Sequence, residues 1–213
     1  RVFLKGPQPV ISHLGFEPFI TGEEINLIAN VKWPAAPQNF SLASLQGELF
    51  TLGKNGQFTK MNQKPALQIL NVLDINNWVR RLRLDFSDLT NDKIPFESLK
   101  GKITFKDSFL RLSEPVVIDG SSYVITMGGR VNLDSNQLDL QLAATLPIAT
   151  NAAWIAGLVA GLPAAAGLYV ASKIFDFDDH LKGLTSLTYA ITGPLAEPDV
   201  QFKGMAAPPK KEK

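Results

Sequence analysis

The stretch that decides the fold is residues 24–33, EINLIANVKW, in which apolar and polar side chains alternate. The apolar members of the alternation are Ile25, Leu27, Ala29, Val31 and Trp33. Ile28 is the single apolar residue among the polar positions. Successive side chains of a β-strand point to opposite faces of the sheet, so this period of two predicts a strand with one apolar face. The same alternation recurs in residues 81–87, 99–106, 138–142 and 187–191.

Short polar or glycine-containing segments separate the alternating stretches and predict turns. They are residues 53–56, 106–108, 119–122 and 134–136. Connections this short join antiparallel neighbours, because parallel strands need long crossovers. A weak repeat, SLQGEL at residues 44–49 and SLKGKI at 98–103, indicates an extended sheet built from similar units. The fold class is therefore predicted to be mainly β, with an antiparallel sheet that has one apolar and one solvated face.

Two segments break the alternation and predict helices. Residues 64–80 fit a helix with Pro65 in its first turn. Residues 152–172 carry no charge and are rich in Ala and Gly, and Pro163 divides them. Three interpretations of this second segment remain open: a helical hairpin packed on the sheet, a hairpin that dips into a membrane, or a transmembrane helix.

Composition excludes several classes of function. Hydrophobic residues make up 45% of the chain and charged residues 19%, against roughly 25% charged in typical domains. A net charge of +1 offers no field to attract nucleic acid, and the chain has no Cys. No nucleophile elbow or phosphate-binding glycine motif occurs, and Asp176, Asp178, Asp179 and His180 are interpreted as a polar turn. We therefore expect no enzyme activity, cofactor, metal or nucleic-acid partner.

These patterns give a domain organisation. We expect an antiparallel β-groove with one helix near 64–80 in residues 1–148, and an apolar helical hairpin in residues 149–182. Returning strands are expected in residues 183–203 and a disordered basic tail in 204–213. The chain opens at Arg1 without an initiator Met, so we expect it to be part of a longer protein.

Several stretches, taken in order, resemble the C-terminal region of the YhdP family, AsmA-like envelope proteins of Gram-negative bacteria. They are WPAAP at residues 33–37, RLRLDFSDL at 81–89, PFESLKG at 95–101, GGRVNL at 128–133, LDL at 138–140 and YAITGP at 189–194. The resemblance covers roughly residues 20–203. It implies a curved, taco-like β-groove in the periplasm, at the C-terminal end of a protein anchored in the inner membrane. It also implies phospholipid transport between the inner and outer membranes, with this end nearest the outer membrane.

The alternating residues are then expected to line the groove and contact lipid. The expected lipid contacts are Ile25, Leu27, Val31, Trp33, Leu84, Phe86, Ile103, Phe105, Leu138 and Leu140. The Ala/Gly-rich segment is expected to close the groove end or touch the outer membrane. The residues expected to do so are Trp154, Ile155, Leu158, Leu162, Leu168 and Tyr169.

A different class of function remains open. The chain could be a structural or interaction module for outer-membrane protein assembly, similar to TamB. In that case the edge of the sheet would pair with a strand of an outer-membrane or periplasmic protein partner. A hydrolase would need a paired acid and nucleophile, which the sequence does not offer.

Overall fold

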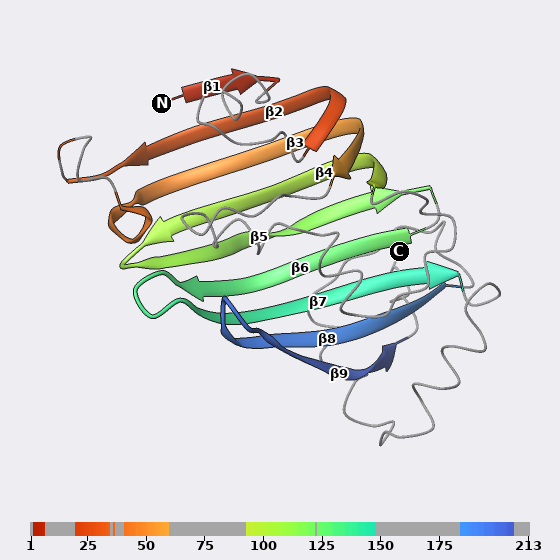
Figure 1. Cartoon of the computed structure of the whole chain (residues 1–213). Helices are drawn as coiled ribbons and strands as arrows, with labels where there is room; N and C mark the ends of the chain where they lie inside the picture. Colours follow the sequence, from red (N-terminus) through yellow and green to blue (C-terminus); the bar gives the residue numbers. More distant parts are fainter. Residues whose placement is uncertain are drawn as a thin grey trace, which may run out of the picture.

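The computed structural model describes residues 2–6, 20–34, 36, 41–59, 93–121, 123–147 and 184–206. These residues form one nine-stranded antiparallel sheet whose strand order follows the chain (Figure 1). The strands are β1 (Val2–Lys5), β2 (Ile20–Lys32), β3 (Gln46–Thr59), β4 (Lys93–Lys106), β5 (Phe109–Gly120), β6 (Tyr123–Asn132), β7 (Gln137–Pro147), β8 (Leu184–Pro194) and β9 (Asp199–Ala206). A short 3-10 helix, η2 (Leu42–Ser44), precedes β3.

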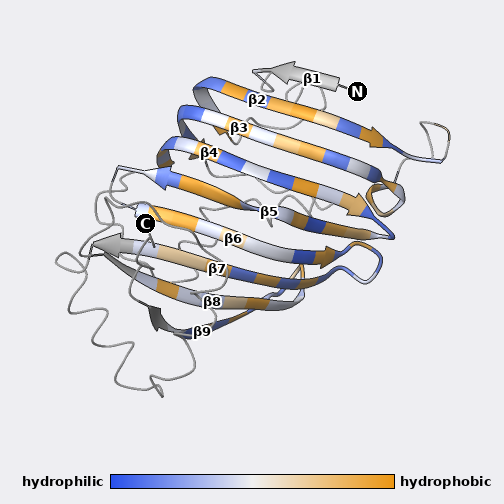
Figure 2. Cartoon of the chain, turned by 180° about the vertical axis from the view of Figure 1, so that it is seen from behind, coloured by the Kyte–Doolittle hydropathy of each residue, from blue (hydrophilic) through white to orange (hydrophobic). Residues whose placement is uncertain are grey.

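Strand pairing places the apolar residues of neighbouring strands directly opposite one another. Ile103 of β4, for example, lies between Leu49 of β3 and Leu112 of β5. Leu140 of β7 lies opposite Ile191 of β8. Because side chains alternate along each strand, this register gathers the apolar residues on one side of the sheet, here called the apolar face. The opposite side, which carries the charged residues, is called the polar face, and Figure 2 shows the alternation along the strands.

The described sheet is open, because β1 and β9 end the strand order and pair with one neighbour each. Its strands curve along their length (Figure 1). The predicted mainly β fold and open antiparallel sheet are thereby confirmed. β9 continues past residue 203, where we expected the tail to begin.

The helical predictions cannot be compared with the structure. Residues 64–80 and 149–182 lie outside the described residues, and so does the strand expected at 81–87. No helix long and apolar enough to cross a bilayer is found in the part of the chain that the structure describes.

Three of the four predicted turns are confirmed, and one is wrong. Residues 106–108, 119–122 and 134–136 join β4 to β5, β5 to β6 and β6 to β7. Residues 53–56 instead lie inside β3. Gly56 is needed there for packing, since a Cβ at this position would lie 2.4 Å from Cζ of Phe96. The Phe96 ring in turn packs on Phe58, with ring centroids 5.1 Å apart.

The centre of the sheet is irregular where β5 meets β6. The register shifts between Leu112 and Val116, and Pro115 within this interval has no N–H to donate to the strand ladder. On β6, Gly129 has a positive φ of 119°, and a Cβ there would lie 2.3 Å from the carbonyl oxygen of Asp139. A hollow on the polar face lies beside this irregularity, with Leu112, Ser113 and Gly129 in its lining.

The glycines of β3 and β6 give a stability prediction. Gly56→Val should lower the free energy of unfolding by about 2 kcal/mol, because the added methyl groups collide with the Phe96 ring. Gly128→Val is the matched control, since a Cβ at Gly128 meets nothing within 4 Å. Urea denaturation of the three proteins measures both effects. Equal stabilities for the two variants would contradict the packing role of Gly56.

Candidate functional site

The apolar face is continuous from β2 to β9. Twenty-five buried residues, contributed mainly by the strands, form one hydrophobic cluster. Members that were not among the expected lipid contacts include Leu99, Leu110, Leu112, Ile118, Ile125, Met127, Leu142, Leu187, Tyr189 and Ile191. Partly buried residues such as Leu49 of β3 pack against the cluster. The candidate site is thus a surface made by many strands rather than a local pocket.

Seven of the residues expected to contact lipid lie on the apolar face. They are Ile25, Leu27 and Val31 on β2, Ile103 and Phe105 on β4, and Leu138 and Leu140 on β7. Their exposure differs along the sheet. Ile103 is 5% exposed and Leu140 1%, whereas Leu27 and Val31 are only partly buried. The more accessible part of the apolar face is therefore its β2–β3 end.

The remaining expected residues fall elsewhere. Trp33 follows the end of β2 and is 37% exposed. Leu84 and Phe86 lie outside the described residues. The same holds for the six expected groove-end residues, Trp154, Ile155, Leu158, Leu162, Leu168 and Tyr169, and for Asp176, Asp178, Asp179 and His180.

Sequence reasoning missed the apolar residues of β3 because their alternation is interrupted. Gly53 occupies a position opposite Ile25 and Leu99, where an apolar residue would be expected. Phe50 lies on the polar face opposite Ile28, the exception in residues 24–33. The faces of the β3 residues can be assigned from their pairing, because β2 and β4 on either side alternate clearly.

The apolar face carries a buried hydroxyl without a partner. Tyr189 is 4% exposed, and its Oη finds no hydrogen-bond partner within the described strands. Burial raises the pKa of the Tyr189 phenol above its ordinary value, so the hydroxyl stays protonated and can donate. Its ring contacts Phe202 of β9, with centroids 5.3 Å apart. By contrast, the Tyr123 hydroxyl donates to the carbonyl oxygen of Pro95.

The polar face is crossed by ion pairs between neighbouring strands. Lys54 Nζ lies 3.3 Å from Glu24 Oε2, and Lys102 Nζ lies 2.9 Å from Glu48 Oε1. The groups of the first pair are more than half exposed, so it contributes little to stability. Both pairs lie on the part of the polar face that β2, β3 and β4 form.

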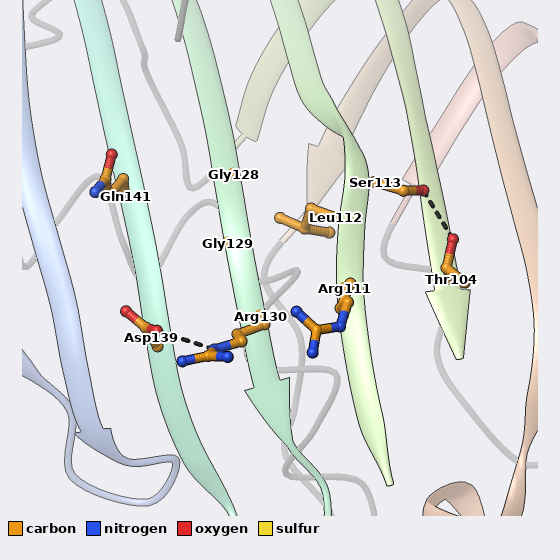
Figure 3. Close-up of a pocket in the computed structure, with 9 residues that line it drawn as sticks. All are labelled: Thr104, Arg111, Leu112, Ser113, Gly128, Gly129, Arg130, Asp139 and Gln141. Carbon is orange, nitrogen blue, oxygen red and sulfur yellow. Dashed lines mark hydrogen bonds and ion pairs between the residues drawn. The ribbon is translucent and has the colours of Figure 1, made fainter. Parts of the chain in front are cut away.

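A hollow of about 610 Å³ lies on the polar face over β4 to β7 (Figure 3). It is lined by Thr104, Arg111, Leu112, Ser113, Gly128, Gly129, Arg130, Asp139 and Gln141. Arg130 Nε donates to Asp139 Oδ2 at 3.0 Å, and Thr104 Oγ1 donates to Ser113 Oγ at 2.9 Å. None of these residues was expected as a site, because they come from four separate strands that only the sheet pairing brings together.

Metal-binding chemistry finds no support in the described strands, where no group of three or more potential ligands gathers. The partly buried side chains of Leu27, Val31 and Leu49 on the apolar face offer nonpolar contacts, and the hollow offers polar ones. Neither brings together an acid, a base and a nucleophile in the manner of a hydrolase.

Comparison with known proteins agrees with the geometry. Residues 8–200 match the family described as YhdP protein. The chain is 27% identical over 194 residues to the intermembrane phospholipid transporter YhdP of Escherichia coli (strain K12). This alignment covers 91% of the chain but only 15% of that relative, so the chain spans a small part of its length. No solved structure matches the chain.

The two buried tyrosines give a test of the apolar face. Tyr123→Phe should lower the free energy of unfolding by about 1 kcal/mol, because it removes a hydrogen bond. Tyr189→Phe should leave the free energy of unfolding unchanged or raise it, because the Tyr189 hydroxyl makes no hydrogen bond that the substitution would remove. Urea denaturation midpoints compare the two variants. An equal loss in both would mean that the Tyr189 hydroxyl is already bonded.

Proposed function

Because the chain belongs to the YhdP family, we propose that its apolar face binds phospholipid acyl chains and conducts them between the inner and outer membranes. The Escherichia coli relative is named as an intermembrane phospholipid transporter, and this chain aligns with 15% of that protein. The corresponding location is the periplasm, at the C-terminal part of a protein anchored in the inner membrane. No catalytic residue is needed, because transport neither makes nor breaks a covalent bond.

The continuous apolar face is the observation that carries this proposal. Acyl chains resist water by roughly 0.8 kcal/mol for each CH₂ group, so a two-chain lipid needs cover to cross an aqueous space. A curved open sheet provides cover on one side and leaves the headgroup in water. A closed barrel would have to admit the charged headgroup as well.

The aliphatic side chains that line the apolar face favour sliding of a lipid along the face over tight binding at one position. Leu27, Val31 and Leu49 are aliphatic, and their contacts with an acyl chain depend little on orientation. A lipid can therefore exchange one such contact for the next without crossing a large barrier. The partly exposed β2–β3 end, where these residues lie, is the proposed point at which acyl chains first meet the face.

Tyr189 is the polar exception on this face. Its unpartnered hydroxyl costs free energy in the empty protein, and an ester carbonyl oxygen of a bound lipid would accept its hydrogen bond. Tyr189 thereby offers a position at which the glycerol region of a lipid pauses. The aliphatic residues around it, Leu142 and Ile191, contact the adjoining acyl chains.

A second candidate function rests on the edge of the sheet. β9 pairs only with β8 among the described strands, and its other side offers N–H and C=O groups to a further strand. A client strand of an outer-membrane protein could add there, which would make the chain an assembly module. This function uses the edge and leaves the apolar face without a guest.

Two substitutions on β3 test lipid binding. Leu49→Asp on the apolar face should reduce bound phospholipid several-fold, because a carboxylate is poorly solvated beside acyl chains. Leu52→Asp is the matched control on the polar face of the same strand, where Leu52 is 53% exposed. Native mass spectrometry of the purified proteins measures the bound lipid. Equal lipid in both variants would contradict the proposal, provided that both retain cooperative unfolding.

Photo-crosslinking separates the two candidate functions. A photoreactive residue at Phe105, on the apolar face, should capture phospholipid in cells. The same residue at Phe109, on the polar face of the neighbouring strand, should not. Capture of a protein at Phe105, with no lipid adduct, would favour the assembly module instead.

A further inference from the structure

We propose that the hollow on the polar face, between Arg111 and Gln141, binds a phosphate group. By strand register, Arg111, Arg130 and Gln141 lie on the side of the sheet opposite the apolar face, whereas Leu112 at the margin of the hollow belongs to the hydrophobic cluster. The inference uses only the polar-face groups, so it does not depend on the proposed lipid function. It rests on three features: a facing pair of guanidinium groups that share one carboxylate, Asp139, an unpartnered amide oxygen and an empty space between them (Figure 3).

The first feature is a pair of like charges. Arg111 of β5 lies directly opposite Arg130 of β6 in the strand register. Like charges in this position repel each other, so the pair is unfavourable without an anion. Asp139 bonds to Arg130, and no carboxylate is found beside the Arg111 guanidinium in the described part of the chain. The nearest charged neighbours on β4 do not change this balance, because Lys102 is already paired with Glu48.

Phe109 holds both guanidinium groups in place. The Cζ atoms of Arg111 and Arg130 lie 5.2 and 5.6 Å from the centre of its ring. Cation–π contacts of this kind limit the freedom of long side chains, and they leave available the N–H groups other than the Nε–H that Arg130 donates to Asp139. The planar guanidinium group presents parallel N–H donors that match two oxygens of a phosphate.

The opposite wall of the hollow offers a hydrogen-bond acceptor that has no donor in the described structure. Gln141 of β7 lines the hollow, and its Oε1 atom is buried without a partner among the described residues. A phosphate at neutral pH still carries an O–H group, which Gln141 can accept while the arginines bind the other oxygens. Sulfate has a similar shape and charge but carries no proton at this pH. The site should therefore prefer phosphate over sulfate.

Space for the ligand comes from Gly128. This residue faces Gln141 across β6 and β7, and a Cβ built on it meets no atom within 4 Å. The lack of a side chain at Gly128 therefore leaves free space on the polar face of the sheet. Two sources could supply the ligand: free phosphate, or the phosphomonoester headgroup of a lipid.

Titration of the whole chain with sodium phosphate tests the site, with sodium sulfate at matched ionic strength as the comparison. Nuclear magnetic resonance follows the Nε–H signals of Arg111 and Arg130 and the side-chain amide of Gln141. We expect saturable shifts at all three and an affinity for phosphate about tenfold higher than for sulfate, the amount that one hydrogen bond to a charged group gives. Shifts that never saturate, or equal affinities for the two anions, would overturn the proposal.

Matched variants locate the binding. Arg111→Met should weaken phosphate binding about tenfold or more, and Gly128→Val should weaken it by narrowing the hollow beside Gln141. Lys100→Met removes the same charge from the polar face of β4, away from the hollow, and should bind phosphate as the unchanged chain does. Thermal unfolding with and without phosphate provides a second readout, since only proteins that bind the anion gain stability from it. Equal phosphate affinity in Arg111→Met and the unchanged chain would refute the site.

Vesicles distinguish the two sources of phosphate. Phosphatidylcholine vesicles with and without phosphatidic acid are offered to the unchanged chain and to Arg111→Met. Binding that needs both phosphatidic acid and Arg111 identifies a lipid headgroup as the ligand. Saturable binding of soluble phosphate, without binding to these vesicles, identifies the free anion. A chain that binds neither lacks the proposed site.

Discussion

Cross-strand register is the constraint on which the rest of this structure depends. Most strands alternate between apolar and polar side chains over part of their length, and a shift of one residue in such a pairing would move an apolar row to the polar side. The observed pairings keep Ile103 between Leu49 and Leu112, and Leu140 opposite Ile191. The continuous apolar face follows from this agreement between neighbours. Hydrophobic burial and strand pairing therefore stabilise the same arrangement.

Much of the sheet could be predicted from the sequence because alternation is a local signal. Residues 24–32 and 99–106 fall in strands, and Asp107 and Ser108 form the expected tight turn, both with positive φ. The signal failed where glycine serves packing instead of turning, as at Gly56 beside Phe96. It also failed for the hollow, since residues from four strands meet there only through pairing and a register shift. The sequence of a single strand does not reveal which residues of other strands will lie beside it.

The two faces of the sheet divide the chemistry of the chain. On the apolar face, aliphatic side chains and the single unpartnered phenol of Tyr189 suit a guest that is mostly hydrocarbon. On the polar face, Arg111, Arg130 and Gln141 offer directed hydrogen bonds around an open space. Because one sheet thickness separates the faces, a change on one side can leave the other intact. The opposite faces can thus be varied separately by choosing odd or even positions of one strand.

The order of the strands has a consequence for how such proteins change over generations. Each strand pairs only with the strands before and after it in the chain. A hairpin of two strands can therefore be gained or lost without rerouting any other connection, and the following strand keeps its direction. Relatives of different length can arise by such steps, each adding or removing about 10 Å of sheet width, the spacing of two strands. The extent of the apolar face along the strand order is then a heritable trait, set by the number of such hairpins.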